Sequence, residues 1–241
     1  MIDIETWMPR ATEALKEEFG DRLLCVGLQG SRLRGEARPD SDIDILIIVD
    51  ELGVDDLDRM RAAIRPLPES ERAAGFTCGR RELAAWPKYE LFQFLHGTRC
   101  WHGDLASLLP ALDASDIRYG AQVEVANLYH MTAHSYLTVG CRKRAETTAT
   151  LQALCKASFF ALQMVTYLRC GEFAATKRDL LALLRSRADT DAEDSATGIA
   201  LLRYSMDPSP LSACDAASAR EVYGRLLDWC AARLREFGGA C

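Results

Sequence analysis

The chain has 241 residues, of which 49% are hydrophobic and 27% are charged, the proportions of an ordinary globular protein. Its formal net charge of -6 argues against nucleic acid as a partner, because contacts along a phosphate backbone need clustered Lys and Arg. No apolar run approaches the ~20 residues of a membrane span, and Met1–Gly20 is acidic and amphipathic rather than signal-like. We therefore expect a cytoplasmic protein with neither a membrane nor a nucleic-acid partner.

The nine cysteines are odd in number and scattered, and no C-x-x-C pair occurs. This pattern favours reduced thiols that serve as small hydrophobic residues over a disulfide framework or a zinc site.

The first part of the chain combines helical and strand patterns. Apolar residues recur at helical spacing in the first predicted helix, which ends at Gly20. The run Ile43–Val49 is almost continuously apolar and β-branched, as in a strand buried on both faces. The predicted elements are a helix over Glu5–Phe19, strands over Leu23–Leu28 and Ile43–Val49, a helix ending near Ile64, and strands over Tyr89–Leu95 and Thr98–Trp101.

Helical periodicity dominates after Gly103, and the predicted linker runs over Leu105–Ser115. Thr176 and Asp179 form a capping-box pattern, and Gly171 is a helix stop. The predicted helices are Arg118–Val139, Glu146–Arg169, Lys177–Ala188, Ala196–Met206 and Ala216–Phe237.

The chemistry is concentrated in Gly30-Ser31-Arg32-Leu33-Arg34-Gly35 and the following Ser41-Asp42-Ile43-Asp44. Side chains at i and i+2 of a strand share a face, so Asp42 and Asp44 project together. Adjacent carboxylates repel unless a cation lies between them, and hard oxygen ligands suit Mg²⁺. Two Mg²⁺ ions could activate a hydroxyl and stabilise pyrophosphate as it leaves.

The glycine-serine turn is a candidate phosphate cradle. Gly30 allows close approach of the backbone, and Ser31 offers a hydroxyl and a main-chain N–H. Arg34 could neutralise a triphosphate, with Arg32 and Arg38 as weaker candidates, while Ser41 belongs to the same nucleotide-binding set. Either the turn or the Asp-x-Asp pattern alone would be ordinary, and only their combination before a buried strand indicates function.

Together these segments resemble the signature of the DNA-polymerase-β-like nucleotidyltransferase superfamily, in particular small bacterial enzymes of the aminoglycoside adenylyltransferase type. The resemblance implies an α/β, mixed-sheet nucleotidyltransferase domain over 1–104, followed by an all-α helical bundle over 115–241. It also implies a third carboxylate on a later strand, which by order falls on Glu90 as a metal ligand or general base. An edge-strand glutamate facing water is the alternative for Glu90.

The resemblance implies transfer of a nucleoside monophosphate, AMP from ATP, to a hydroxyl of a small molecule such as an aminoglycoside. Asp42, Asp44 and Glu90 would hold Mg²⁺, and the helical domain would shape the acceptor pocket. The alternatives are a protein adenylyltransferase of the antitoxin type and a nucleotide-binding module without turnover. Related enzymes often dimerise, so a homodimer stays open.

Overall fold

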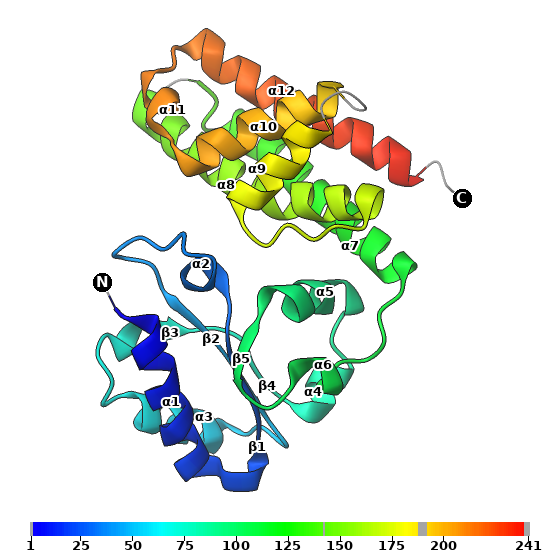
Figure 1. The fold of residues 1–241 in the computed structure, drawn as a ribbon. Coiled ribbons are helices and arrows are strands. Elements are labelled where there is room, and N and C mark those ends of the chain that lie inside the picture. The colour runs from blue at the N-terminus through cyan, green and yellow to red at the C-terminus, as the bar shows by residue number, and fades with distance from the viewer. Residues whose placement is uncertain (1, 142, 188–191, 239–241) are drawn as a thin grey trace. The chain divides into compact units, whose positions relative to one another are not determined.

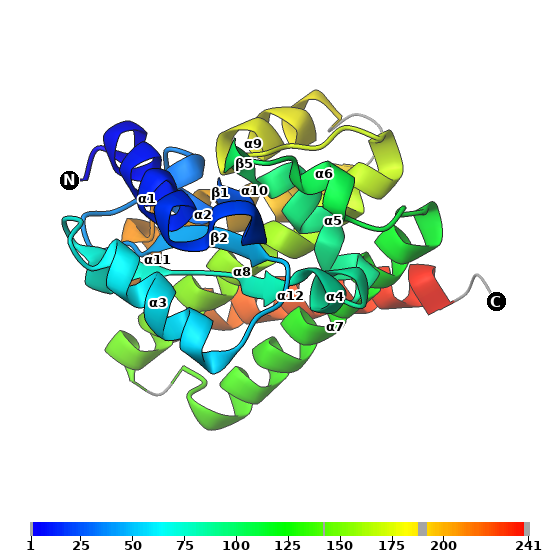
Figure 2. The same ribbon diagram turned by 90° about the horizontal axis from the view of Figure 1, so that it is seen from below.

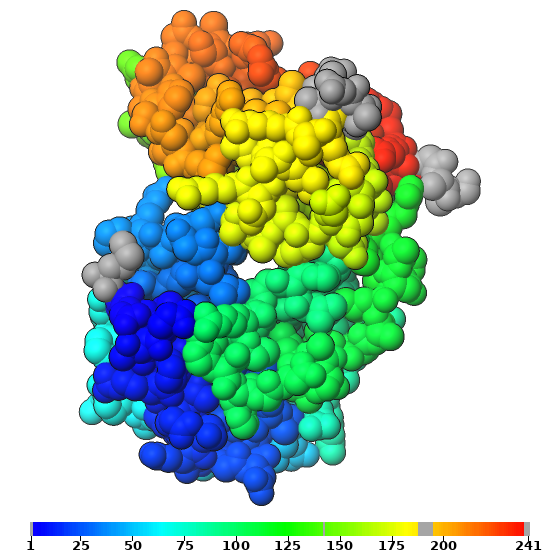
Figure 3. Space-filling view, viewed as in Figure 1, coloured from blue at the N-terminus to red at the C-terminus, as the bar shows by residue number. Residues whose placement is uncertain are grey.

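The structure is a computed structural model that describes residues 2–141, 143–187 and 192–238. The chain divides into two compact units between Leu112 and Asp113 (Figure 1). In Figure 3 the first unit runs from blue to green and the second from green to red. Ala188, the predicted end of one helix, lies outside the described residues, as do Met1 and Cys241.

The first unit is built on a mixed five-stranded sheet. Its strands are β1 (Leu23–Leu28), β2 (Ile43–Val49), β3 (Ala73–Ala74), β4 (Thr77–Gly79) and β5 (Arg99–His102). Strands β3 and β4 both pair with β2 in parallel, β2 pairs with β1 in antiparallel fashion, and β5 pairs with the other edge of β1, also antiparallel. The predicted strands at Leu23–Leu28, Ile43–Val49 and Thr98–Trp101 are therefore confirmed.

Helices α1 (Ile4–Phe19) and α3 (Val54–Ile64) cover one face of the sheet. The odd-numbered residues of β2, from Ile43 to Val49, pack with them in one buried cluster. Figure 2 shows α1 and α3 on one side of the sheet. Asp3 caps the N-terminus of α1, where its carboxylate accepts from Glu5 N, and Gly20 follows the last residue of the helix, as the sequence predicts.

The opposite face carries α4 (Arg80–Ala84), α5 (Lys88–Gly97) and α6 (Leu105–Leu108). A second buried cluster contains Leu46 and Ile48 of β2 together with Leu83 of α4, Leu91 of α5 and Leu105 of α6. Two short 3-10 turns, Gly20–Arg22 and Ser70–Arg72, complete the unit. The helix α6 lies inside the segment that the sequence predicts to be a linker.

The predicted strand over Tyr89–Leu95 is wrong, because this segment is the helix α5. Its aromatic residues favour a strand by propensity. In the structure, however, Leu91 and Phe92 are buried on one side of the helix, and Phe94 packs against Phe76 with ring centroids 4.5 Å apart. Tertiary packing on the sheet thus outweighs local propensity. Pro87 precedes the first turn and Gly97 closes the last one.

The second unit contains only helices among its described residues. They are α7 (Ala114–Thr138), α8 (Arg144–Cys170), α9 (Lys177–Ser186), α10 (Ala192–Met206), α11 (Ser209–Ala213) and α12 (Ala216–Gly238). The helix α8 packs against α7 and α10, and α12 packs against α7. Thr176 and Asp179 form the predicted capping box. A mixed-sheet domain followed by a helical one confirms the predicted fold class. None of the described helices is both long and apolar enough to span a membrane.

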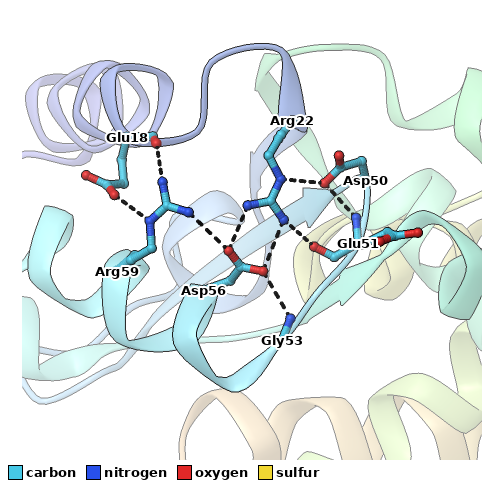
Figure 4. Close-up of polar contacts among 7 residues, drawn as sticks. All are labelled: Glu18, Arg22, Asp50, Glu51, Gly53, Asp56 and Arg59. Atoms are coloured by element: carbon cyan, nitrogen blue, oxygen red, sulfur yellow. Dashed lines mark hydrogen bonds and ion pairs between the residues drawn. The ribbon is translucent and has the colours of Figure 1, made fainter.

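An ion network joins α1, the 3-10 turn before β1, the loop after β2 and α3, at the end of β2 remote from Asp42 (Figure 4). Arg22 donates to Asp50 at 3.0 Å, to Asp56 at 2.8 Å and to the carbonyl of Glu51 at 2.8 Å. Arg59 donates to Glu18 and to Asp56. Hydrogen bonds from Arg22 and from Gly53 N lower the pKa of Asp56 to about 2.

We expect Asp56→Asn to lower the melting temperature at pH 7 by a few degrees, because Arg22 and Arg59 lose a shared anionic partner. The lowered pKa of Asp56 means that its carboxylate stabilises the folded state above its ordinary pKa of 3.8. This contribution is lost as the pH falls towards 2, so the melting temperatures of wild type and variant should converge there.

Thermal unfolding followed by circular dichroism from pH 7 to pH 2 measures this convergence. The matched control is Asp58→Asn, which removes an exposed carboxylate whose ion-pair partner, Arg61, is also exposed. A constant difference between wild type and Asp56→Asn across the pH range would contradict the assignment.

Candidate active site

The turn after β1 lies directly against the start of β2. Gly30 has a φ of +72°, and a Cβ built there would stand 1.8 Å from Oδ2 of Asp44. The backbone N–H of Gln29 donates to the carbonyl of Asp44 at 2.8 Å, which holds the two segments together. A side chain at position 30 would therefore collide with the Asp44 carboxylate. Glycine is required here for its left-handed backbone and for the space it leaves.

Asp42 and Asp44 flank the buried Ile43 at the start of β2. Ile43 and Ile45 enter the core beneath α1 and α3, so the alternation of the strand directs both carboxylates to the opposite face. Asp42 is exposed and Asp44 is half-buried. The structure thus brings Gly30, Asp42 and Asp44 together at one end of the strand.

Arg32 has a structural role that the sequence did not reveal. It lies in the short helix α2 (Gly30–Leu33) and is only 8% exposed. Its Nε donates to the carbonyl of Asp42 at 2.9 Å, and its NH2 group donates to the carbonyl of Ser41 at 2.6 Å. A planar guanidinium can hold two carbonyls at once, so Arg32 fixes the backbone that presents Asp42. It does not face solvent as a phosphate ligand would.

The other predicted nucleotide-binding residues lie in or beside the loop between α2 and β2. Ser31 is half-buried, and its carbonyl accepts from Glu36 N. Arg34 is paired with Glu36 at 3.2 Å. The hydroxyl of Ser41 accepts from Arg38 N at 2.8 Å, closing a turn before Asp42.

Arg72 supports the same loop from a distant part of the sequence, through a hydrogen bond from NH1 to the carbonyl of Pro39. Glu69 holds the Arg72 guanidinium in turn, at 2.9 Å. No sequence signal identified this contact, because it joins residues 33 positions apart.

Glu90 is not part of the same cluster. It lies in the first turn of α5, where its carboxylate accepts from Nε1 of Trp86 at 2.7 Å. Within the described residues, no group of three or more His, Cys, Asp and Glu side chains is arranged to hold a metal ion. The β3 residue paired with Asp44 is Ala74, so that neighbouring strand supplies no carboxylate opposite Asp44 either. The role predicted for Glu90 stays a prediction without geometric support.

The arrangement fits a divalent cation held partly by its substrate. Two adjacent carboxylates, one exposed and one half-buried, are oxygen ligands of the kind that Mg²⁺ accepts. Mg²⁺ keeps several water or phosphate ligands and needs only one or two protein carboxylates. Asp42 and Asp44 would hold it beside the Gly30 turn, where a phosphate chain could complete its coordination.

We expect Gly30→Ala to lower the free energy of unfolding by about 1–2 kcal/mol because alanine disfavours the left-handed backbone conformation. A further loss of stability should follow because the Asp44 side chain must move away from the new methyl group. Gly35→Ala is the matched control, since Gly35 also has a positive φ, +67°, but a Cβ there would meet no atom within 4 Å. Urea unfolding of both variants isolates the contact with Asp44. Equal destabilisation by the two substitutions would contradict this close packing.

Comparison with known proteins agrees with this geometry. Residues 8–77 match the family model of the nucleotidyltransferase domain, a range that includes the Gly30 turn and both aspartates. No curated protein sequence matches the chain. Among solved structures, the chain is similar to spectinomycin adenyltransferase from Enterococcus faecialis, crystallised with ATP and spectinomycin. The identity is 15%, the TM-score is 0.51, and the match covers 93% of this chain and 99% of that one. Residues 8–77 of the first unit therefore match a nucleotidyltransferase domain, and the chain has a fold similar to that of a solved adenyltransferase.

Proposed function

We propose that this protein transfers AMP from ATP to a hydroxyl group of a small molecule, with Mg²⁺ bound by Asp42 and Asp44. The observation that carries the proposal is the packing of Gly30 against the Asp44 carboxylate, within a segment that matches the nucleotidyltransferase domain. This packing leaves no space for a side chain at position 30 and brings the backbone of the turn directly beside the Asp44 carboxylate.

In the proposed reaction the acceptor oxygen bonds to the α-phosphorus, the bond from that phosphorus to the bridging oxygen breaks, and pyrophosphate leaves. The acceptor proton passes to a base. Ser31 would donate its hydroxyl and N–H to the phosphates, and Arg34 would exchange part of its pairing with Glu36 for them. Mg²⁺ at Asp42 and Asp44 would offset the negative charge of the triphosphate and of the departing pyrophosphate.

The proposed acceptor class rests on the structural neighbour, whose crystals held spectinomycin as well as ATP. Spectinomycin and the aminoglycosides are therefore the first acceptors to test. The acidic net charge of -6 is compatible with a cationic acceptor.

The direct test incubates the purified full chain with Mg²⁺, ATP labelled at the α-phosphate, and a panel of spectinomycin and aminoglycosides, followed by cell lysate. Label should move to a small molecule, with one pyrophosphate released for each transfer. Asp42→Asn and Asp44→Asn should each lower the rate by at least about 100-fold, a loss comparable to removing one preorganised electrostatic group.

Asp58→Asn is the control. Like the other two variants it removes one negative charge, but its exposed carboxylate lies in α3, away from the site. The variant Glu90→Gln distinguishes a role of Glu90 in the reaction from a purely structural one. A loss of rate as large as that of Asp44→Asn would assign Glu90 to the reaction. An unchanged rate would limit Glu90 to its hydrogen bond with Trp86. Label on a protein in the lysate would favour the protein adenylyltransferase instead. Tight binding of Mg-ATP with no transfer to any acceptor would favour a binding module.

Arg32 offers a separate test of how the site is positioned. Arg32→Lys keeps the charge but cannot hold the carbonyls of Ser41 and Asp42 in the same bidentate way. We expect kcat to fall by about 10–100-fold, with a much smaller change in the KM for ATP, because Arg32 positions Asp42 rather than binding phosphate. Arg38→Ala, at an exposed position of the same loop, is the control. A rise in KM with unchanged kcat would instead make Arg32 a phosphate ligand.

A further inference from the structure

Two cysteines lie in contact across the sheet, on strands far apart in sequence. Cys25 is in β1 and Cys100 is in β5, and their Sγ atoms are 3.7 Å apart. Both belong to the cluster beneath α4, α5 and α6, where Cys25 is fully buried and Cys100 is half-buried. A disulfide needs an S–S distance of about 2.05 Å, so a shift of about 1.7 Å would join them.

The surroundings of the two sulfurs are different. The contact with the Cys25 sulfur and a hydrogen bond from the backbone N–H of Leu105 lower the pKa of the Cys100 thiol. The carboxylate of Asp104 and partial burial oppose this shift without cancelling it. The hydrogen bond with Cys100 and burial raise the pKa of Cys25. The half-buried Cys100 is therefore the sulfur of the pair that loses its proton more readily, and Cys25 is the buried thiol beside it.

We propose that Cys25 and Cys100 form a reversible disulfide when the protein meets hydrogen peroxide. The thiolate of Cys100 attacks one peroxide oxygen, the O–O bond breaks, and the departing hydroxide takes a proton to become water. The thiol of Cys25 then attacks the resulting sulfenic acid, the S–S bond forms, and a second water leaves. The two sulfurs are oxidised and one peroxide is reduced.

The disulfide would fix an edge strand next to the candidate active site. Strand β5 pairs only with β1 among the described strands. Just before β5, the hydroxyl of Thr98 accepts from Nε2 of Gln29 at 2.8 Å. Gln29 is also the residue whose N–H holds Asp44, so the covalent link would lie on the strand that ends at the Gly30 turn.

The chain provides its own peptide map for the test. Trypsin places Cys25 in the peptide 23–32, Cys100 in 100–118 and Cys78 in 73–80, each with one cysteine. After brief exposure to hydrogen peroxide and blocking of free thiols, mass spectrometry should find peptide 23–32 joined to 100–118 in the monomer, and dithiothreitol should separate them. Cys100 sulfinic acid without this link, or links between chains only, would overturn the proposal.

Variants identify the role of each sulfur. Cys25→Ser should leave Cys100 as a sulfenic acid that dimedone traps, whereas Cys100→Ser should leave Cys25 unoxidised. Cys78→Ser is the matched control, because Cys78 is buried in the same cluster and burial raises its pKa to about 12, and this variant should still form the link. In the wild type, the rate of Cys100 alkylation should rise with pH through a midpoint below that of an ordinary cysteine, because the Cys25 contact and the Leu105 N–H lower the pKa of Cys100. A midpoint above about 8.5, the ordinary range of a cysteine, would contradict the assignment even if a variant fails to fold.

Discussion

The antiparallel pairing of β1 with β2 is the constraint on which the candidate site depends. It places Leu28 opposite Ile45, and the next residues continue the contact through the hydrogen bond from Gln29 to Asp44. Because the chain must turn immediately after this contact, Gly30 adopts a positive φ and lies against the Asp44 carboxylate. The turn proposed to bind phosphate and the carboxylate pair proposed to bind metal thus both depend on one pairing of two buried strands.

The scaffold holds this pairing from both sides. The residues of β2 alternate between the cluster beneath α1 and α3 and the cluster beneath α4, α5 and α6. A slip by one residue would exchange the two sets of apolar side chains and turn Asp42 and Asp44 towards the face that α1 and α3 cover. The Arg22 network secures the far end of β2. Arg32 and Arg72 secure the loop at the near end through backbone carbonyls. Charged side chains fix both ends of a strand whose middle is wholly apolar.

The sequence predicts most of the long elements of this fold, and the elements that it does not predict have physical causes. The strand over Ile43–Val49, the turn at Gly30 and the long helices of the second unit follow from apolar periodicity and punctuating glycines. The strands β3 and β4 were missed because, at two and three residues, they carry no periodicity. The segment that contains Glu90 was predicted to be a strand because its aromatic residues favour strands locally. It is a helix because Phe94 packs against Phe76, a contact that the local sequence does not reveal.

The site itself shows the same division. Residues close in sequence, such as Gly30, Asp42 and Asp44, could be grouped by a motif. The contacts of Arg72 with Pro39 and of Cys25 with Cys100 join distant segments, and only the fold brings them together. Arg32 illustrates an intermediate case, since its position in the motif suggested a phosphate ligand while its buried side chain serves the backbone.

The most direct measurement of the central claim is electron paramagnetic resonance of Mn²⁺, as a substitute for Mg²⁺, with a non-reactive α,β-methylene analogue of ATP. The wild-type chain should attenuate the free Mn²⁺ signal well beyond the attenuation that the nucleotide alone causes, and Asp42→Asn combined with Asp44→Asn should remove this additional attenuation. An additional attenuation that is equal in wild type and the double variant would show that the metal and nucleotide bind elsewhere on the protein, and would contradict a site at Asp42 and Asp44.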